Sequence, residues 1–214
     1  MAALFQRTTV ISDDNEGPVV NIAAWIGMTV MIFCVFTRIG SKFKIVRQWT
    51  VDDSLIFSTM IFAICHTVTL SVMVSNGLGQ PRGNLTKNMI ANFEKYGYAS
   101  QLLYIPTLCL GKLSTLGYLK ALAPSGSRYG ATNILLTGFV VLWATGAGFA
   151  IAFQCSLPHP WAILSAQCLN RAILWDAIGA LDILTDICII ILPAYLVWTL
   201  QMPLSKKLLV VVVF

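Results

Sequence analysis

The chain is dominated by long apolar stretches that contain almost no charged residues. Residues 19–37 and residues 54–81 carry no Asp, Glu, Lys or Arg, and residues 96–119 carry a single one, Lys112. A helix needs roughly 20 residues to cross the hydrocarbon core of a membrane, which is about 30 Å thick. Stretches of this length therefore predict membrane-spanning segments. We expect five full spans, at about 19–38, 53–75, 96–119, 131–153 and 175–200, and the incomplete start of a sixth at 207–214.

The composition agrees with a membrane protein. Hydrophobic residues make up 57% of the 214 residues and charged residues only 11%, against roughly 25% in soluble domains. Backbone N–H and C=O groups inside lipid must pair within their own segment, so the spans are expected to be helices. The predicted fold is an all-α, multi-pass transmembrane helix bundle in contact with the lipid bilayer. The net charge of +5 forms no basic stripe, and no nucleic-acid-binding motif accompanies it, so we expect no nucleic-acid partner.

The distribution of Lys and Arg between the spans predicts the orientation of the chain. The first, third and fifth connections hold eight of these residues, and the remaining outer segments hold five. Because basic loops tend to stay in the cytoplasm, we expect the N-terminus on the extracellular or lumenal side of the plasma membrane or of a secretory-pathway membrane. Residues 1–18 then form a short extracellular polar tail. With no apolar stretch before residue 19, we expect no cleavable signal peptide.

Two features of the predicted outer loops fit this orientation. The second loop contains the sequon Asn84-Leu85-Thr86, which can be glycosylated only on the lumenal side. Such a sequon also arises by chance, so an unmodified Asn84 stays open as an alternative. The fourth loop carries Cys155 and Cys168, and we expect a disulfide between them, which requires an oxidising compartment.

The stretch RIGSKFKIVRQWTVDD at residues 38–53 concentrates charge between the first two spans. We interpret its basic residues as the first cytoplasmic loop, lying in water and against anionic lipid headgroups. Asp52 and Asp53 follow at the N-terminus of the second helix, where free N–H groups and the helix dipole favour negative charge, so we expect them to cap that helix. A second interpretation makes the basic loops a docking surface for a cytoplasmic signalling partner.

Four ionisable residues deep inside the spans form the candidate site: Lys112, Asp182, Asp186 and His66. Such groups are costly in a membrane and usually face a partner or water. Asp182 and Asp186 are four residues apart and share one helix face. We predict an ion pair between Lys112 and Asp186, with Asp182 lining a wetter cavity above it. His66 either joins this cluster or makes a single hydrogen bond between helices.

Three functions of this intramembrane cluster stay open at the level of the sequence. It can stabilise the packing of helices through polar contacts, form a ligand or switch site in a receptor, or form an ion or proton path in a transporter. An enzyme is not expected, because the sequence lacks GxSxG, HExxH, CxxC and phosphate-binding loop motifs. We expect no catalytic residue, no metal site and no cofactor.

Several short motifs occur together in a characteristic order. They are Asp52-Asp53 opening the second span, Gly77-Leu78-Gly79 at its outer end, Gln101-Leu102-Leu103-Tyr104 and Lys112-Leu113-Ser114 in the third, Cys155, Trp161 and Cys168 in the fourth loop, and ILTDICIIILP ending at Pro193 with LQMP after it. From about residue 20 onward the chain thus resembles the fungal rhodopsin-domain family of integral membrane proteins. It departs from the family pattern at Gln80, where the family often has His, and at Asp182, where Asn is common.

The resemblance implies seven helices and a receptor-like protein. Seven helices need roughly 50 to 60 residues beyond Phe214, so we expect a C-terminally truncated member. Retinal is not implied, because the Schiff-base lysine of retinal proteins lies on the seventh helix and the lysine inside a span here is Lys112. The favoured function is sensing of an extracellular cue or small-molecule ligand by outer loops at 76–95 and 154–174. The alternative is a transporter or a membrane-bound accessory protein of small-molecule metabolism.

Overall fold

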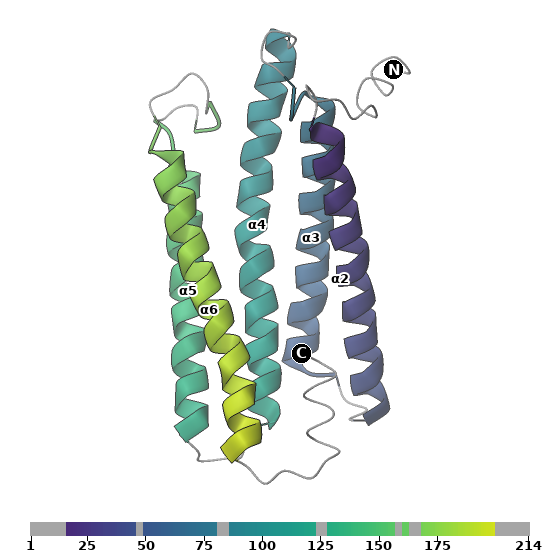
Figure 1. Ribbon diagram of the computed structural model, residues 1–214, viewed down its shortest axis with the longest axis vertical. Coiled ribbons are helices and arrows are strands. Elements are labelled where there is room, and N and C mark those ends of the chain that lie inside the picture. Colours follow the sequence, from purple (N-terminus) through teal and green to yellow (C-terminus); the bar gives the residue numbers. More distant parts are fainter. Residues whose placement is uncertain are drawn as a thin grey trace.

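The computed structural model describes residues 16–45, 49–80, 86–122, 128–156, 160–162 and 168–199. Within them the chain forms five long helices: α2 (Gly17–Ile45), α3 (Val51–Ser75), α4 (Lys87–Leu122), α5 (Arg128–Ala152) and α6 (Arg171–Thr199). The helices stand side by side, and each runs opposite to the one before it (Figure 1). All five are long and apolar enough to cross a membrane. The predicted all-α, multi-pass bundle is confirmed, whereas the predicted sixth segment at 207–214 lies outside the described residues.

Two helices extend beyond the predicted spans. The first continues to Ile45 rather than ending near residue 38, and α4 begins at Lys87 rather than near residue 96. The predicted limits followed the loss of apolar character, but a helix can continue past the hydrocarbon core when its polar side chains find partners or water. On α2 those side chains are Arg38 and Lys42, which pair with α3. They therefore belong to a helix and not to a loop.

The interior of the bundle is built around α4, which lies between α3 on one side and α5 and α6 on the other (Figure 1). Two apolar clusters fill the space between α4, α5 and α6. One contains Leu116, Leu119 and Val140, and the other contains Ile105, Ala147 and Ile178. Lys112 lies between Ile105 and Leu116 in sequence on α4. The candidate site is thus enclosed by hydrocarbon on both sides along the helix axis.

The outer surface of the bundle carries large apolar side chains that a soluble protein would bury. On α2 these include Val30, Phe33 and Phe36, whose side chains are more than half exposed. A continuous exposed apolar face of this kind is unfavourable in water. Lipid chains cover such a face when the helix spans a bilayer, in agreement with the membrane assignment.

Glycines shape the connection that follows α3. Gly77 and Gly79 both have positive φ angles, of 105° and 84°, a conformation that costs other residues free energy. Gly79 also packs against the start of α2, where an added Cβ would lie 2.3 Å from the backbone nitrogen of Gly17. The glycine motif therefore allows the α3 end and the α2 start to meet at the same end of the bundle.

Candidate functional site

Lys112 on α4 is the centre of a buried polar cluster between α4 and α6. Its Nζ atom lies 2.7 Å from Oδ1 of Asp182 and 2.9 Å from Oδ1 of Asp186. It also donates to the backbone carbonyl of Asp182 at 2.8 Å and to the Thr185 hydroxyl at 2.6 Å. On its other side the ammonium lies 5.4 Å from the centre of the Trp143 ring. One lysine therefore connects α4 with both the backbone and the side chains of α6.

The predicted ion pair of Lys112 with Asp186 is present, but the order of the two carboxylates differs from the prediction. Asp182 is the more buried, with 17% of its side chain exposed, against 52% for Asp186. Both a carboxylate oxygen and the backbone carbonyl of Asp182 face Lys112 on one turn of α6, and the Thr185 hydroxyl donates to the same carbonyl at 2.7 Å. Lys112 is centred on this turn, and Asp186 lies at its rim. The expectation that Asp182 lines the wetter side is wrong.

The Lys112 ammonium has more acceptors than it can serve. It carries three N–H groups, and four oxygens surround it: two of Asp182, one of Thr185 and one of Asp186. Its own side chain is only 7% exposed, so these bonds form in a medium that strengthens them. The cluster contains two carboxylates and one lysine, and its oxygens compete for the same protons.

His66 is separate from this cluster. Its Nδ1 atom lies 3.0 Å from the backbone oxygen of Ser100 and 3.1 Å from the Ser100 hydroxyl, which joins α3 to α4. The ring also lies against Tyr104, which in turn contacts Trp175 of α6. Ser100 and Lys112 are twelve residues apart on α4, roughly 18 Å along the helix axis. Of the two predicted possibilities for His66, the structure has the hydrogen bond between helices.

A second ionic cluster lies at the opposite end of the bundle from the glycine turn, where α2 ends and α3 begins. Lys42 lies 2.7 Å from Asp52 and 3.0 Å from Asp53, and it also donates to the Thr50 hydroxyl. Asp53 does cap α3 as predicted, since it accepts the backbone N–H of Thr50 at 2.8 Å. The two carboxylates are nevertheless buried, and only 11% of the Lys42 side chain is exposed. The expectation that Lys42 lies in water against lipid headgroups is therefore wrong.

Arg38 and Ser114 extend this cluster to α4. The Arg38 guanidinium lies 3.9 Å from Asp52, donates to the backbone oxygen of Ser114 at 3.1 Å, and covers the Tyr118 ring at 5.1 Å. Ser114 is fully buried, and its hydroxyl donates to the backbone carbonyl of Asp52 at 2.9 Å. Sequence reasoning missed the role of Ser114. A usable signal was its spacing from Tyr118, because residues four apart on a helix share one face.

The loop after α5 contains the predicted disulfide. Cys155 and Cys168 are bonded, with their Cα atoms 4.1 Å apart, and the two residues form an isolated antiparallel bridge. The backbone N–H of Leu169 donates to the carbonyl of Gln154 at 2.9 Å beside it. Asn84 of the sequon and the basic residues Arg47, Lys206 and Lys207 lie outside the described residues. Across the described part of the chain, no three His, Cys, Asp or Glu side chains gather as metal ligands would.

Comparison with known proteins identifies the family of the chain. A family described as the fungal rhodopsin domain matches residues 37–214. The chain is also 31% identical over 140 residues to a protein of Emericella nidulans described as a SAT4 family membrane protein. This match covers 62% of the chain and 36% of the relative, so the chain spans well under half of that protein. No solved structure matches the chain. Since the family match includes both ionic clusters and the disulfide loop, the chain belongs to the fungal rhodopsin-domain family of membrane proteins.

Proposed function

We propose that this membrane protein is a receptor-like sensor, in which a cue received in the outer half of the bundle changes the inner ends of the helices. The observation that carries the proposal is the position of Lys112 and Ser114, two residues apart on α4. Lys112 pairs with α6, and Ser114 donates to the Asp52 carbonyl on α3. Within less than one helical turn, α4 therefore contacts both ionic clusters. A displacement of α6 can reach α2 and α3 through this short segment.

The Lys112 cluster has the properties that a switch requires. Its four acceptors compete for three N–H groups, so the ammonium can favour either carboxylate with little change in position. Packed interfaces tend to have discrete alternative arrangements rather than a continuous range. A small shift of α6 that exchanges Asp182 for Asp186 would therefore produce two distinct states. The cue itself biases this equilibrium only if it binds the two states with different affinity.

The N-terminal end of α2 is proposed to face outside. The disulfide supports this orientation, because it lies at the same end of the bundle as the start of α2 and needs an oxidising compartment (Figure 1). A test is glycosidase treatment of the protein expressed in a fungal host, compared with an Asn84→Gln variant. A glycosidase-sensitive mass that the variant lacks supports the orientation. If mass spectrometry instead finds cytoplasmic phosphorylation or ubiquitination in the segment around Asn84, the orientation is wrong.

The inner end of α2 would present the surface for a cytoplasmic signalling partner. Lys44 is exposed there, whereas Lys42 is bound by Asp52 and Asp53 and is not available to a partner. Charge neutralisation at Lys44 should therefore weaken signalling without disturbing the ionic cluster.

The coupling between the two clusters can be measured with spin labels on the inner helix ends. We would place labels at Lys44→Cys on α2 and Ala194→Cys on α6, both exposed positions, in nanodiscs. The four free cysteines, Cys34, Cys65, Cys109 and Cys188, are first replaced by serine. Lys112→Met should add a second population to the distance distribution, because α6 loses its ionic connection to α4. Lys120→Met, an exposed lysine on the same helix, is the matched control.

The result distinguishes the sensor from a static membrane protein. A second population in the folded Lys112→Met protein, absent from Lys120→Met, supports two states of the inner ends. A single distribution that is unchanged in both variants contradicts the proposal, provided that circular dichroism shows both to be folded.

Transport is the second candidate, favoured by one observation: Asp186 is half exposed within a membrane-spanning helix while its neighbour Lys112 is buried. A partly exposed carboxylate at this depth is typical of ion and proton paths. Proteoliposomes with a pH-sensitive dye inside would show gradient-driven proton uptake that Asp186→Asn abolishes. Asp176→Asn, on the same helix, is the control. Uptake that equals that of empty liposomes excludes this function.

A further inference from the structure

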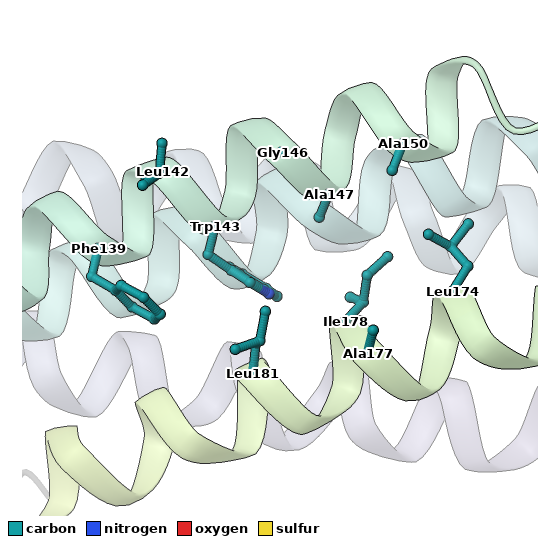
Figure 2. Close-up of a pocket in the computed structure, with 10 residues that line it drawn as sticks. All are labelled: Phe139, Leu142, Trp143, Gly146, Ala147, Ala150, Leu174, Ala177, Ile178 and Leu181. Atoms are coloured by element: carbon teal, nitrogen blue, oxygen red, sulfur yellow. The ribbon is translucent and has the colours of Figure 1, made fainter.

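A lateral groove runs between α5 and α6 on the face of the bundle away from α2. Its outer part is a cavity of about 340 Å³ lined by apolar residues that include Phe139, Leu142, Ala147, Leu174 and Leu181 (Figure 2). The wall of this cavity is open at Gly146, since a Cβ added to this residue would meet no heavy atom within 4 Å. Cavities of this size are typical of small-molecule sites.

The groove continues along both helices. A second cavity of about 870 Å³ shares Phe139 and Leu142 with the first and reaches Thr132 on α5 and Leu192 on α6. From Thr132 to Ala150 the two cavities follow α5 over roughly 27 Å at 1.5 Å per residue. This length is close to the thickness of the hydrocarbon core, about 30 Å. The groove therefore opens sideways toward lipid chains rather than toward water.

Trp143 supplies the polar feature of this otherwise apolar groove. The residue lines the outer cavity and points from α5 toward Leu181 of α6 (Figure 2). Its side chain is almost completely buried, with 6% of the residue exposed, and its indole nitrogen finds no acceptor among the described residues. Leaving a buried N–H group unpaired lowers the stability of the folded protein. A bound molecule with an oxygen at this level would remove that cost.

The wall of the groove is also the wall of the Lys112 cluster. The Trp143 ring contacts the Lys112 ammonium on its face, and Thr185, which lines the second cavity, accepts a hydrogen bond from the same ammonium at 2.6 Å. Thr185 is itself only 1% exposed. Any molecule that lies against Trp143 and Thr185 therefore acts directly on two of the residues that contact Lys112.

We propose that the groove binds an elongated lipid-like molecule from the bilayer, with hydrocarbon on both sides of a single hydrogen-bond-accepting oxygen. The indole N–H of Trp143 turns toward the groove and donates to that oxygen, and the hydrocarbon arms lie along the two cavities. Turning the ring changes its contact with Lys112, which connects binding with the ionic cluster. The inference rests on the proposed sensor function, for which it names the class of ligand and its route of entry.

Binding can be tested with two simple probes that differ only in the oxygen. These are a long-chain dialkyl ketone with its carbonyl at mid-chain and the alkane of the same chain length, added to phosphatidylcholine nanodiscs that hold the full chain. The readout is the rise in Tm as a function of probe mole fraction, because a ligand that binds the folded state stabilises it. We expect the ketone to act at about ten-fold lower mole fraction than the alkane. Trp143→Phe should abolish this difference.

Two glycines on α5 provide a matched control that does not depend on Trp143. Neither Gly146 nor Gly148 has a heavy atom within 4 Å of an added Cβ, but Gly146 lines the groove and Gly148 does not. Gly146→Leu should fill the groove and abolish the effect of the ketone, whereas Gly148→Leu should leave it unchanged. Both substitutions gain the same helix propensity, so their effect on the probe-free Tm cancels in the comparison.

The proposal is overturned if ketone and alkane act equally on the native chain, or if Gly146→Leu and Gly148→Leu respond alike to the ketone. It is also overturned if Leu142→Cys, in the chain whose four free cysteines are replaced by serine, forms disulfides between two copies when dissolved oxygen oxidises the thiols, because a second copy then covers the groove. These measurements detect binding alone. A failure here with a positive spin-label result removes the lipid-like ligand and leaves the sensor function intact.

Discussion

The Nζ atom of Lys112 lies 2.7 Å from the carboxylate of Asp182 and 2.8 Å from the backbone carbonyl of the same residue. This double contact sets the height of α6 relative to α4 in the present arrangement, because it involves the helix backbone as well as a side chain. Asp186 adds a third contact at 2.9 Å from a half-exposed position. The two carboxylates should therefore contribute unequally to stability.

Double-mutant cycles should measure this inequality. Lys112→Met leaves Asp182 buried without its counter-ion, which we expect to cost about 3 kcal/mol or more. Adding Asp182→Leu should recover most of that loss, whereas adding Asp186→Leu should recover little, because Asp186 is the more exposed partner. Thermal unfolding in detergent micelles gives the coupling energy of each pair. Equal coupling energies for the two pairs would contradict the observed geometry.

Lys42 and Lys44 should respond very differently to the same substitution. Lys42→Met removes the cation that pairs with two buried carboxylates, and we expect a loss of about 3 kcal/mol in the free energy of unfolding. Lys44 is exposed, so Lys44→Met should change stability by no more than about 0.5 kcal/mol. Denaturation in micelles checks both. If the two variants lose similar amounts of stability, Lys42 has no special structural role.

The contrast between these two lysines shows where reasoning from sequence reaches its limit. Membrane spans follow from apolar length alone, so the five helices were predictable from residues such as those of 19–37. The pairing of Lys42 with Asp52 was not predictable from the sequence. The distance between these two side chains depends on where α2 ends and on how the chain turns back into α3, and a sequence separation of ten residues determines neither.

The candidate site shows the same division. The shared helix face of Asp182 and Asp186 follows from their spacing, and Lys112 was recognisable as the charge within the third span. Their order of burial was not predictable, because it depends on how α6 is rotated against α4, and Thr185 joins the cluster by accepting a hydrogen bond from Lys112. A threonine in an apolar helix gives no sign of this role, since it usually bonds its own backbone.

Gly79 should be the least replaceable of the glycines in the described turns. It has a φ of +84°, and a Cβ at this position would lie 2.3 Å from the backbone nitrogen of Gly17. We expect Gly79→Ala to cost about 2 kcal/mol or more and to loosen the start of α2. Gly40→Ala is the control, because Gly40 is helical with nothing within 4 Å and should gain slightly in helix propensity. The rate of hydrogen exchange in the first turn of α2 should increase in Gly79→Ala and not in Gly40→Ala. Equal rates in both variants would show that the close contact between Gly79 and Gly17 is unimportant.

Loss of the Cys155–Cys168 bond should lower stability without affecting the inner ionic cluster. The bond closes a loop across a sequence separation of 13, which the chain-entropy model values at about 3 kcal/mol. The double variant Cys155→Ala/Cys168→Ala should therefore have a lower Tm, and reductant should bring the native chain to the same Tm. Cys34→Ala, at an exposed free cysteine on α2, should leave Tm unchanged. A double variant that keeps the native Tm would show that the backbone hydrogen bond from Leu169 to Gln154 is sufficient to hold the loop.

Because the loop lies at the far end of the bundle from Lys42, hydrogen exchange at the α3 N-terminus should not change in any of these proteins.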